Sequence, residues 1–121
     1  GRPRRCGWLD MVALKYAVMM NGVTELIMMK ADVLNSFSTI KVATAYELDG
    51  RRLDHFPFEC GENVTPVYRE FKGWDCDICG VRDYDDFPAE LKDYIAFIEQ
   101  ETGCPVRIIS TGADRSEIVI R

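Results

Sequence analysis

The chain opens with side chains suited to binding anions. Arg2, Arg4 and Arg5 place three guanidinium groups within the first five residues, although the formal net charge of the 121-residue chain is -5. A guanidinium group recognises phosphate or carboxylate through two parallel hydrogen bonds. Gly1 and Pro3 shape the backbone between these groups. The pattern predicts an anion-binding loop, and the alternative on residue types alone is a disordered basic terminus.

A second chemical pattern follows a predicted buried strand at residues 25–29. Lys30, Ala31 and Asp32 stand at the carboxyl end of that strand, where open α/β sheets bind their ligands. A carboxylate there can accept hydrogen bonds from the ring N–H and the exocyclic amine of guanine, and adenine offers neither donor in those positions. The lysine stem can lie along the flat base. The alternative is a surface turn, because Lys-x-Asp also recurs by chance.

A third pattern occupies the equivalent place after a predicted strand at residues 106–109. Ser110, Thr111 and Gly112 form a turn of small residues, and small residues let backbone groups approach a ligand closely. The alternative is a plain connecting loop.

Two amphipathic or apolar segments predict helices that would hold these patterns in place. Asp10 can cap a helix over residues 11–20, which is apolar apart from Lys15 and is therefore expected to be buried on most sides. A second helix opens at Pro88 and stops at Thr102–Gly103. Its apolar residues follow the i, i+3, i+4, i+7 pattern: Leu91, Tyr94, Ile95 and Ile98.

Alternation of helices with apolar strands predicts an α/β fold. Further strands are expected at residues 39–48, 67–71 and 117–120, with irregular segments at 56–66 and 73–86. Asp49–Gly50 predicts a hairpin turn that returns through residues 51–53. We therefore expect a mixed, mostly parallel sheet flanked by helices, with a β-hairpin.

The composition is that of one ordinary globular domain, with 47% hydrophobic and 29% charged residues. The acidic balance argues against a nucleic-acid partner. Residues 75–101 carry nine acidic side chains against Arg82 and Lys92, which indicates a solvated face. No apolar run is long enough to span a bilayer, and no signal peptide is evident, so we expect a cytoplasmic protein with no membrane partner.

Cysteine usage favours reduced structural thiols. The cysteines are Cys6, Cys60, Cys76, Cys79 and Cys104. Cys76 and Cys79 form a Cys-x-x-Cys pair, but a zinc site needs two more ligands and His55 is the only histidine. A redox pair is expected at a helix start in a less acidic setting. A small zinc-binding interaction domain is therefore a weaker interpretation of the chain than nucleotide binding.

Residues 1–10, 30–34 and 108–115 resemble, in this order, three motifs of the adenylosuccinate synthetase family. The resemblance covers essentially all 121 residues and corresponds to the C-terminal part of those enzymes. It implies a fragment of a larger nucleotide-binding fold, in which residues 1–121 are the base- and substrate-binding portion. The chain departs from the usual family pattern at Met29, Ala31 and Ala113, where the family has Thr, Leu and Pro.

The resemblance also implies ligands for the three motifs. The arginine loop would bind IMP and aspartate through Gly1, Arg2, Pro3 and Arg4, and Arg4 would also contact GTP. The GTP-binding residues would be Arg4, Lys30, Ala31, Asp32, Ser110, Thr111 and Gly112. Two strand ends would thus converge on one guanine base. Trp8 and Asp10 are expected to be structural, as an anchor and a helix cap.

The family joins IMP to L-aspartate at the expense of GTP, giving adenylosuccinate, GDP and phosphate in purine biosynthesis. That chemistry needs a phosphate loop, a general base, a catalytic histidine and Mg²⁺, and none of these is identifiable in the sequence. We therefore expect no catalytic residue and no metal ligand in this chain, inactivity of the chain alone, and a homodimeric complete enzyme. The alternative is a non-catalytic guanine-nucleotide-binding module, which the upstream coding sequence would distinguish.

Overall fold

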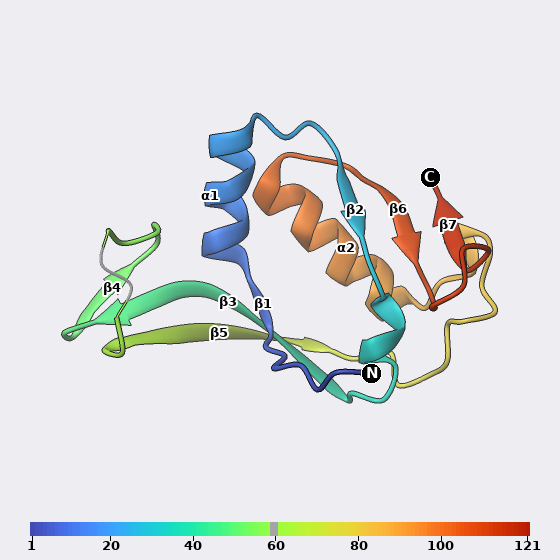
Figure 1. Ribbon diagram of the computed structural model, residues 1–121, viewed down its shortest axis with the longest axis horizontal. Coiled ribbons are helices and arrows are strands. Elements are labelled where there is room, and N and C mark those ends of the chain that lie inside the picture. The colour runs from blue at the N-terminus through green and yellow to red at the C-terminus, as the bar shows by residue number, and fades with distance from the viewer. Residues whose placement is uncertain (59–60) are drawn as a thin grey trace.

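A computed structural model describes residues 1–58 and 61–121 of the chain. Within these residues, the helices are α1 (Met11–Asn21), η1 (Ala31–Leu34), η2 (Tyr84–Asp86) and α2 (Ala89–Thr102). The strands are β1 (Leu9–Asp10), β2 (Leu26–Met28), β3 (Thr39–Leu48), β4 (Arg51–Leu53), β5 (Val64–Lys72), β6 (Val106–Ser110) and β7 (Ile118–Ile120). The strands form two sheets, and Figure 1 shows α1 over β3 and α2 running alongside β6.

Helix α2 carries the centre of the core. Its buried face consists of Leu91, Tyr94, Ile95, Phe97 and Ile98. This face packs with apolar residues of both sheets, among them Val42 and Ile109, in one cluster. The helix ends where Gly103 adopts a left-handed backbone and donates its N–H to the Glu99 carbonyl at 2.9 Å. The predicted second helix is therefore confirmed.

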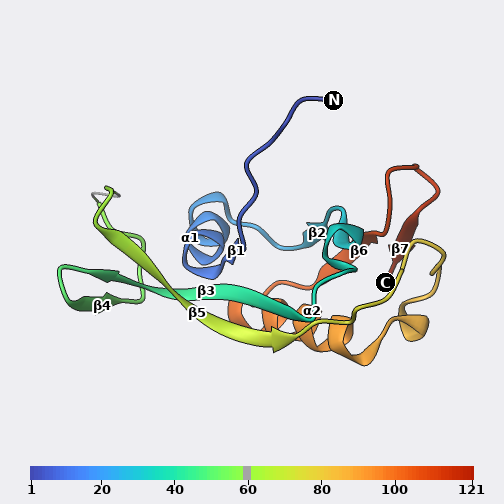
Figure 2. The same ribbon diagram turned by 90° about the horizontal axis from the view of Figure 1, so that it is seen from below.

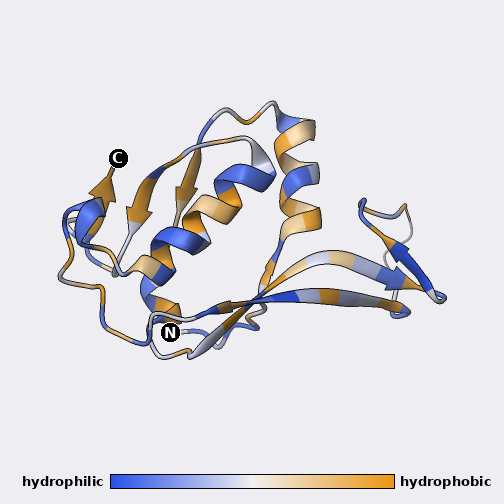
Figure 3. Ribbon diagram, turned by 180° about the vertical axis from the view of Figure 1, so that it is seen from behind, coloured by the Kyte–Doolittle hydropathy of each residue, from blue (hydrophilic) through white to orange (hydrophobic). Residues whose placement is uncertain are grey.

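Helix α1 begins as predicted but is not buried as predicted. The Asp10 carboxylate caps it by accepting the N–H of Ala13 at 3.0 Å. Only Met11 and Val12 are buried, and Met19 is 69% exposed. The expectation of burial on most sides was wrong because α1 packs on β3 and α2 along one side only. Figure 3 shows that most residues of α1 are nevertheless apolar.

Strand β3 is the centre of the first sheet. It pairs in parallel with β1 and antiparallel with β4 and β5, and β3 to β5 form the arm that projects from the body in Figures 1 and 2. Asp49 and Gly50 both have positive φ, at 51° and 78°, which confirms the predicted hairpin turn. Strand β5 begins earlier than expected, within the segment 56–66, and residues 59 and 60 of that segment lie outside the described residues.

The second sheet has the order β2–β6–β7, with a parallel and then an antiparallel pair. The predicted strand at residues 25–29 is only partly buried, since Ile27 is 59% and Met29 is 68% exposed. Among the described residues, β2 lies at an edge of its sheet. The α/β class, the mixed pairing and the hairpin are confirmed, whereas the strands form two sheets in place of one. The expectation of mostly parallel pairing was wrong for the described residues, since β3 pairs antiparallel with β4 and β5, and β6 pairs antiparallel with β7.

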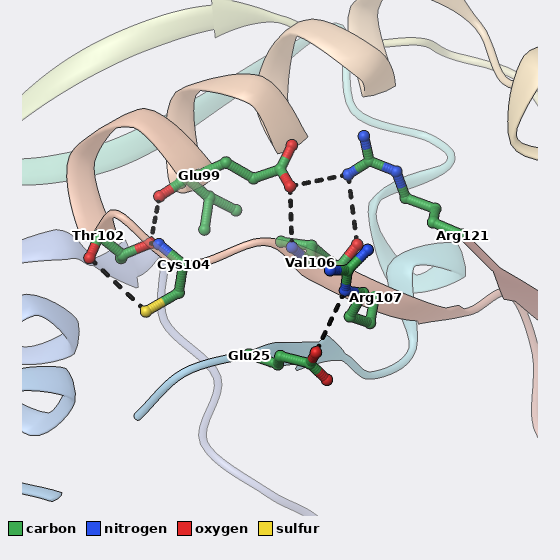
Figure 4. Close-up of polar contacts among 8 residues, drawn as sticks. Glu25, Glu99, Thr102, Cys104, Val106, Arg107 and Arg121 are labelled. Carbon is green, nitrogen blue, oxygen red and sulfur yellow. Dashed lines mark hydrogen bonds and ion pairs between the residues drawn. The ribbon is translucent and has the colours of Figure 1, made fainter. Parts of the chain in front are cut away.

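A network of polar contacts fixes the start of β6 on α2, as Figure 4 shows. The Glu99 carboxylate accepts the N–H of Val106 and a guanidinium N–H of Arg121, both at 2.9 Å. Arg107 pairs with Glu25, just before β2, at 3.3 Å. These contacts hold β6 against α2 and β2, and thereby determine where its carboxyl end lies. Buried Cys104 has the structural role expected of a reduced thiol and donates to the Val23 carbonyl.

Candidate functional site

The structure brings two of the three predicted motifs to the same edge of a sheet. Strands β2 and β6 are parallel neighbours, and Met28 lies opposite Ile109. Lys30 therefore follows the end of one strand where Ser110 ends the other. Helix η1, which contains Asp32, packs against β6. The carboxyl ends of these strands form the base of the candidate site.

The turn after β2 is tightly constrained. Lys30 has a left-handed backbone with φ of 55°, a conformation that is uncommon outside glycine and is found preferentially at functional sites. It leads directly into η1, whose first residue, Ala31, is buried. One carboxylate oxygen of Asp32, Oδ1, is buried and has no hydrogen-bond partner within the described residues.

The turn after β6 is held by hydrogen bonds. The Ser110 hydroxyl donates to the Gly112 carbonyl at 3.0 Å, and the Thr111 N–H donates to the Glu117 carbonyl at 2.8 Å. The Glu117 carboxylate accepts the N–H of Asp114 at 2.9 Å. A Cβ on Gly112 would lie 2.0 Å from that carboxylate, so a larger residue there would displace the Glu117 side chain from its contact with Asp114. These contacts fix the turn without the proline that the family usually has at position 113.

Each turn leaves one polar atom without a partner. Asp32 Oδ1 and Thr111 Oγ1 are the buried side-chain oxygen or nitrogen atoms that lack a hydrogen bond in the part of the chain that is described. Leaving such an atom unsatisfied costs about 1–3 kcal/mol. A ligand that carries hydrogen-bond donors, seated at these strand ends, would remove that cost. The two atoms therefore point to a polar ligand at this edge of the sheet.

The arginine segment lies apart from these turns. Residues 1–7 are exposed, and Figure 2 shows them leaving the body on the side that also carries η1 and the β6–β7 loop. Trp8 is the anchor that was expected, because its ring packs edge-on against Phe37 with centroids 5.1 Å apart. Trp8 also lines an apolar hollow of about 370 Å³ that extends to Lys30. Gly1, Arg2, Pro3 and Arg4 are thus not placed against the strand ends.

The segment between β5 and α2 also reaches the candidate site, which the sequence did not indicate. Asp77 accepts a hydrogen bond from the side chain of Asn35, at the end of η1, and another from the N–H of Cys79. The second contact is the main cause that lowers the Asp77 pKa. The acidic segment is therefore not only a solvated face.

The Cys79 thiol of the Cys-x-x-Cys pair is not activated as a nucleophile. A hydrogen bond from the thiol to the Asp77 carboxylate, together with partial burial and nearby carboxylates, raises the Cys79 pKa to about 11. A thiol activated for redox chemistry has the opposite shift. Among the described residues, no group of three His, Cys, Asp or Glu side chains could hold a metal ion.

Cys79 is expected to react slowly with iodoacetamide in the folded protein. At pH 8, a pKa of about 11 in place of 9.0 leaves about a hundredth of the thiolate, partly offset by its greater nucleophilicity, for a net rate about tenfold lower. Mass spectrometry of timed samples would measure alkylation at Cys79 before and after unfolding in guanidinium. Equal rates in the two conditions would contradict the hydrogen bond to Asp77.

Comparison with known proteins decides the family. The model of the adenylosuccinate synthetase family matches residues 1–119. The chain belongs to the adenylosuccinate synthetase family. The synthetase from Flavobacterium johnsoniae is 57% identical over 122 aligned positions, and that from Porphyromonas gingivalis is 54% identical over 121. Both alignments cover 100% of this chain.

Solved structures of synthetases agree with this assignment. The fully ligated adenylosuccinate synthetase from Plasmodium falciparum superposes with a TM-score of 0.92 at 32% identity. The match covers 99% of this chain but 30% of that one, and the curated synthetases are likewise covered over 29% of their length. This chain therefore spans less than a third of the synthetases it matches. No helix in the described residues is long and apolar enough to cross a membrane.

Proposed function

We propose that these residues are the C-terminal region of a GTP-dependent carbon–nitrogen ligase that joins IMP to L-aspartate. The products are adenylosuccinate, GDP and phosphate. The observation that carries this proposal is the buried, unpartnered Asp32 oxygen at two meeting strand ends, in a chain of this family. A synthetase needs a carboxylate there to select GTP. An ordinary surface turn would not bury a carboxylate oxygen without a hydrogen-bond partner.

In this proposal the turn after β2 reads the guanine base. Asp32 accepts from the ring N–H and the exocyclic amine, while Lys30 and Ala31 lie along the base. Ser110, Thr111 and Gly112 form the opposite side of the base site with backbone groups and the free Thr111 hydroxyl. The left-handed Lys30 backbone supports this reading, since it turns the chain sharply from β2 into η1.

The exposed arginine segment supplies charge stabilisation. Arg2 binds IMP and aspartate and Arg4 binds GTP, within a loop that Gly1 and Pro3 shape. Their guanidinium groups make no ion pair within the described residues, so they are available to phosphate and carboxylate groups. Donors of this kind stabilise charge that develops during phosphoryl transfer.

The remaining machinery belongs to the part of the synthetase that these residues do not include. The phosphate loop, general base, catalytic histidine and Mg²⁺ ligands lie there. Mg²⁺ held there would neutralise the negative charge that develops in phosphoryl transfer of this kind. We place the complete enzyme in the cytoplasm as a homodimer, with no nucleic-acid or membrane partner.

A chimera tests this function. The matching segment of the Flavobacterium johnsoniae synthetase, which is 57% identical, is replaced by residues 1–121, and phosphate release from GTP is measured with IMP and aspartate. The chimera should turn over at a rate on the order of 10 per second, and the 121-residue chain alone should be inactive. Turnover by the chain alone would contradict the proposal. A chimera that binds GTP without making adenylosuccinate would favour the non-catalytic module.

The two arginines should have separable effects in the chimera. Arg2→Leu should impair use of IMP and aspartate, and Arg4→Leu should impair use of GTP. Each removes a charge-assisted contact worth about 1.5–3 kcal/mol, which corresponds to about ten- to hundredfold in kcat/KM. Steady-state kinetics with each substrate varied would measure this. Arg52→Leu, at an exposed position in β4, is the matched control and should leave all three substrates unaffected.

A further inference from the structure

Helix η1, which carries Asp32, is held in place by the side chain of Asn35. This residue is not among those proposed to bind the base. Asn35 follows η1 directly, and its N–H donates to the Asp32 carbonyl at 3.0 Å. The Asn35 side-chain oxygen accepts the indole N–H of Trp74 at 3.1 Å. Its side-chain nitrogen donates to Asp77 Oδ1 at 3.2 Å. One carboxamide thus connects η1 to two residues of another loop.

That loop is itself anchored to the body of the protein. The Gly73 N–H donates to the Ser38 carbonyl at 2.9 Å. Trp74 is 6% exposed and packs near Tyr94 of α2, with ring centroids 6.3 Å apart. Asp77 is fixed in turn by the N–H of Cys79 at 2.9 Å. Asn35 therefore connects η1 to a loop that is itself held in place by hydrogen bonds and packing.

Helix η1 needs such a support. It has four residues and starts from the strained backbone of Lys30, and short 3₁₀ helices have poor hydrogen-bond geometry. The Asp32 carboxylate makes no compensating bond through its buried oxygen. Hydrogen bonds weaken steeply when donor and acceptor move out of line, so a small displacement of the Asp32 carboxylate would weaken the bonds it is proposed to make to the base. The direction of the Asp32 carboxylate thus depends on what holds the end of η1.

We propose that Asn35 is the positioning residue for Asp32, and that its bridge to Trp74 and Asp77 sets how strictly the site selects guanine. This inference rests on the function proposed above. It assigns Asn35 no contact with the nucleotide: the carboxamide acts through the backbone of η1. A role in stability alone would lower the melting temperature without changing the choice between bases.

The test compares GTP with ITP in the chimera, because inosine lacks the exocyclic amine that Asp32 is proposed to bind. Asn35→Ala should raise the KM for GTP by about tenfold and leave kcat within about twofold, since about 1.4 kcal/mol of positioning is lost. The ratio of kcat/KM for GTP to that for ITP should fall by about fivefold. Asn21→Ala is the matched control, since its carboxamide bonds within α1, to the Ala17 carbonyl.

A swap separates positioning from general damage. Asn35→Asp alone places two carboxylates together and should lower the GTP-to-ITP ratio. Adding Asp77→Asn removes the contact between two carboxylates and lets a carboxamide donate to the new carboxylate at position 35. The Cys79 N–H then loses its acceptor, because Asp77 Oδ1 serves both donors, so the ratio should recover in part. If Asn35→Ala is too unstable to purify, Asn35→Asp and the swap make the same comparison.

The outcomes distinguish this inference from the proposed function. If Asn35→Ala and Asn35→Asp keep the GTP-to-ITP ratio and Asp32→Asn lowers it, the positioning role of Asn35 is wrong. The proposed base site is then still supported. An unchanged ratio in Asp32→Asn as well would overturn the proposed base site. A lowered ratio in Asn35→Asp that the swap does not raise at all would also contradict the bridge.

Discussion

Asp32→Asn in the chimera is expected to shift nucleotide preference from GTP toward XTP. The substitution replaces one acceptor oxygen with an NH₂ donor, which meets the exocyclic amine of guanine as donor against donor. Loss of that bond and burial of an unsatisfied group should cost about 1–3 kcal/mol or more, or about ten- to hundredfold in kcat/KM for GTP. Xanthine carries an oxygen where guanine carries the amine, so the new donor suits it better. Competition kinetics of GTP against XTP would measure the change.

Asp49→Asn is the matched control for this prediction. It makes the same chemical change at the exposed hairpin turn, where the φ of 51° also suits asparagine. Its GTP-to-XTP ratio should equal that of the unchanged chimera. If Asp32→Asn folds and retains the original ratio, Asp32 does not touch the base, and the segment is an ordinary turn.

Gly73→Ala is expected to destabilise the protein more than any other glycine substitution without a positive φ. A Cβ there would lie 1.9 Å from the carbonyl oxygen and 2.8 Å from the carbonyl carbon of Phe37. Both atoms are backbone, so the two chain segments must separate and strain the Gly73–Ser38 hydrogen bond. Overpacking of this kind costs about 1–3 kcal/mol and occasionally more. In a protein as long as the chimera, of which this chain is 29%, that lowers the melting temperature by about 1–4 °C.

Gly80→Ala provides the control from the same loop. A Cβ on Gly80 meets nothing within 4 Å, so this variant should melt within about 0.5 °C of the parent. Thermal unfolding of the two chimeras, followed by circular dichroism, gives the comparison. Equal melting temperatures would mean that the Gly73 and Phe37 segments can move apart freely, and the support for Asn35 would be weaker than described.

The elements that depend on local chemistry could be predicted from the sequence. Asp10 marked the start of α1, and Asp49–Gly50 marked the hairpin turn. The apolar spacing from Leu91 onward marked α2. Each signal lies within a few residues of the feature it determines. The positions of Lys30 and Ser110 after two strands were predicted for the same reason, and the parallel pairing then placed them together.

Features that depend on distant contacts could not be predicted. The exposure of Met19 and Ile27 follows from which surfaces other elements cover, and apolar composition does not reveal that. The bridge from Asn35 to Trp74 joins residues that are 39 positions apart, with no local pattern to mark it. Asparagine and tryptophan are also common in purely structural roles. The support of the base site therefore became visible only in three dimensions.

Because β2 pairs in parallel with β6, the two halves of the base site come together late in biosynthesis. Leu26 finds its partner Val106 only after all of the intervening chain has been made, and such long-range pairings form slowly. Until then, the edge of β2 that pairs with β6 is open, which makes it a site for unwanted strand pairing on the ribosome. Nascent chains arrested before β6 should therefore bind chaperones and should not bind GTP.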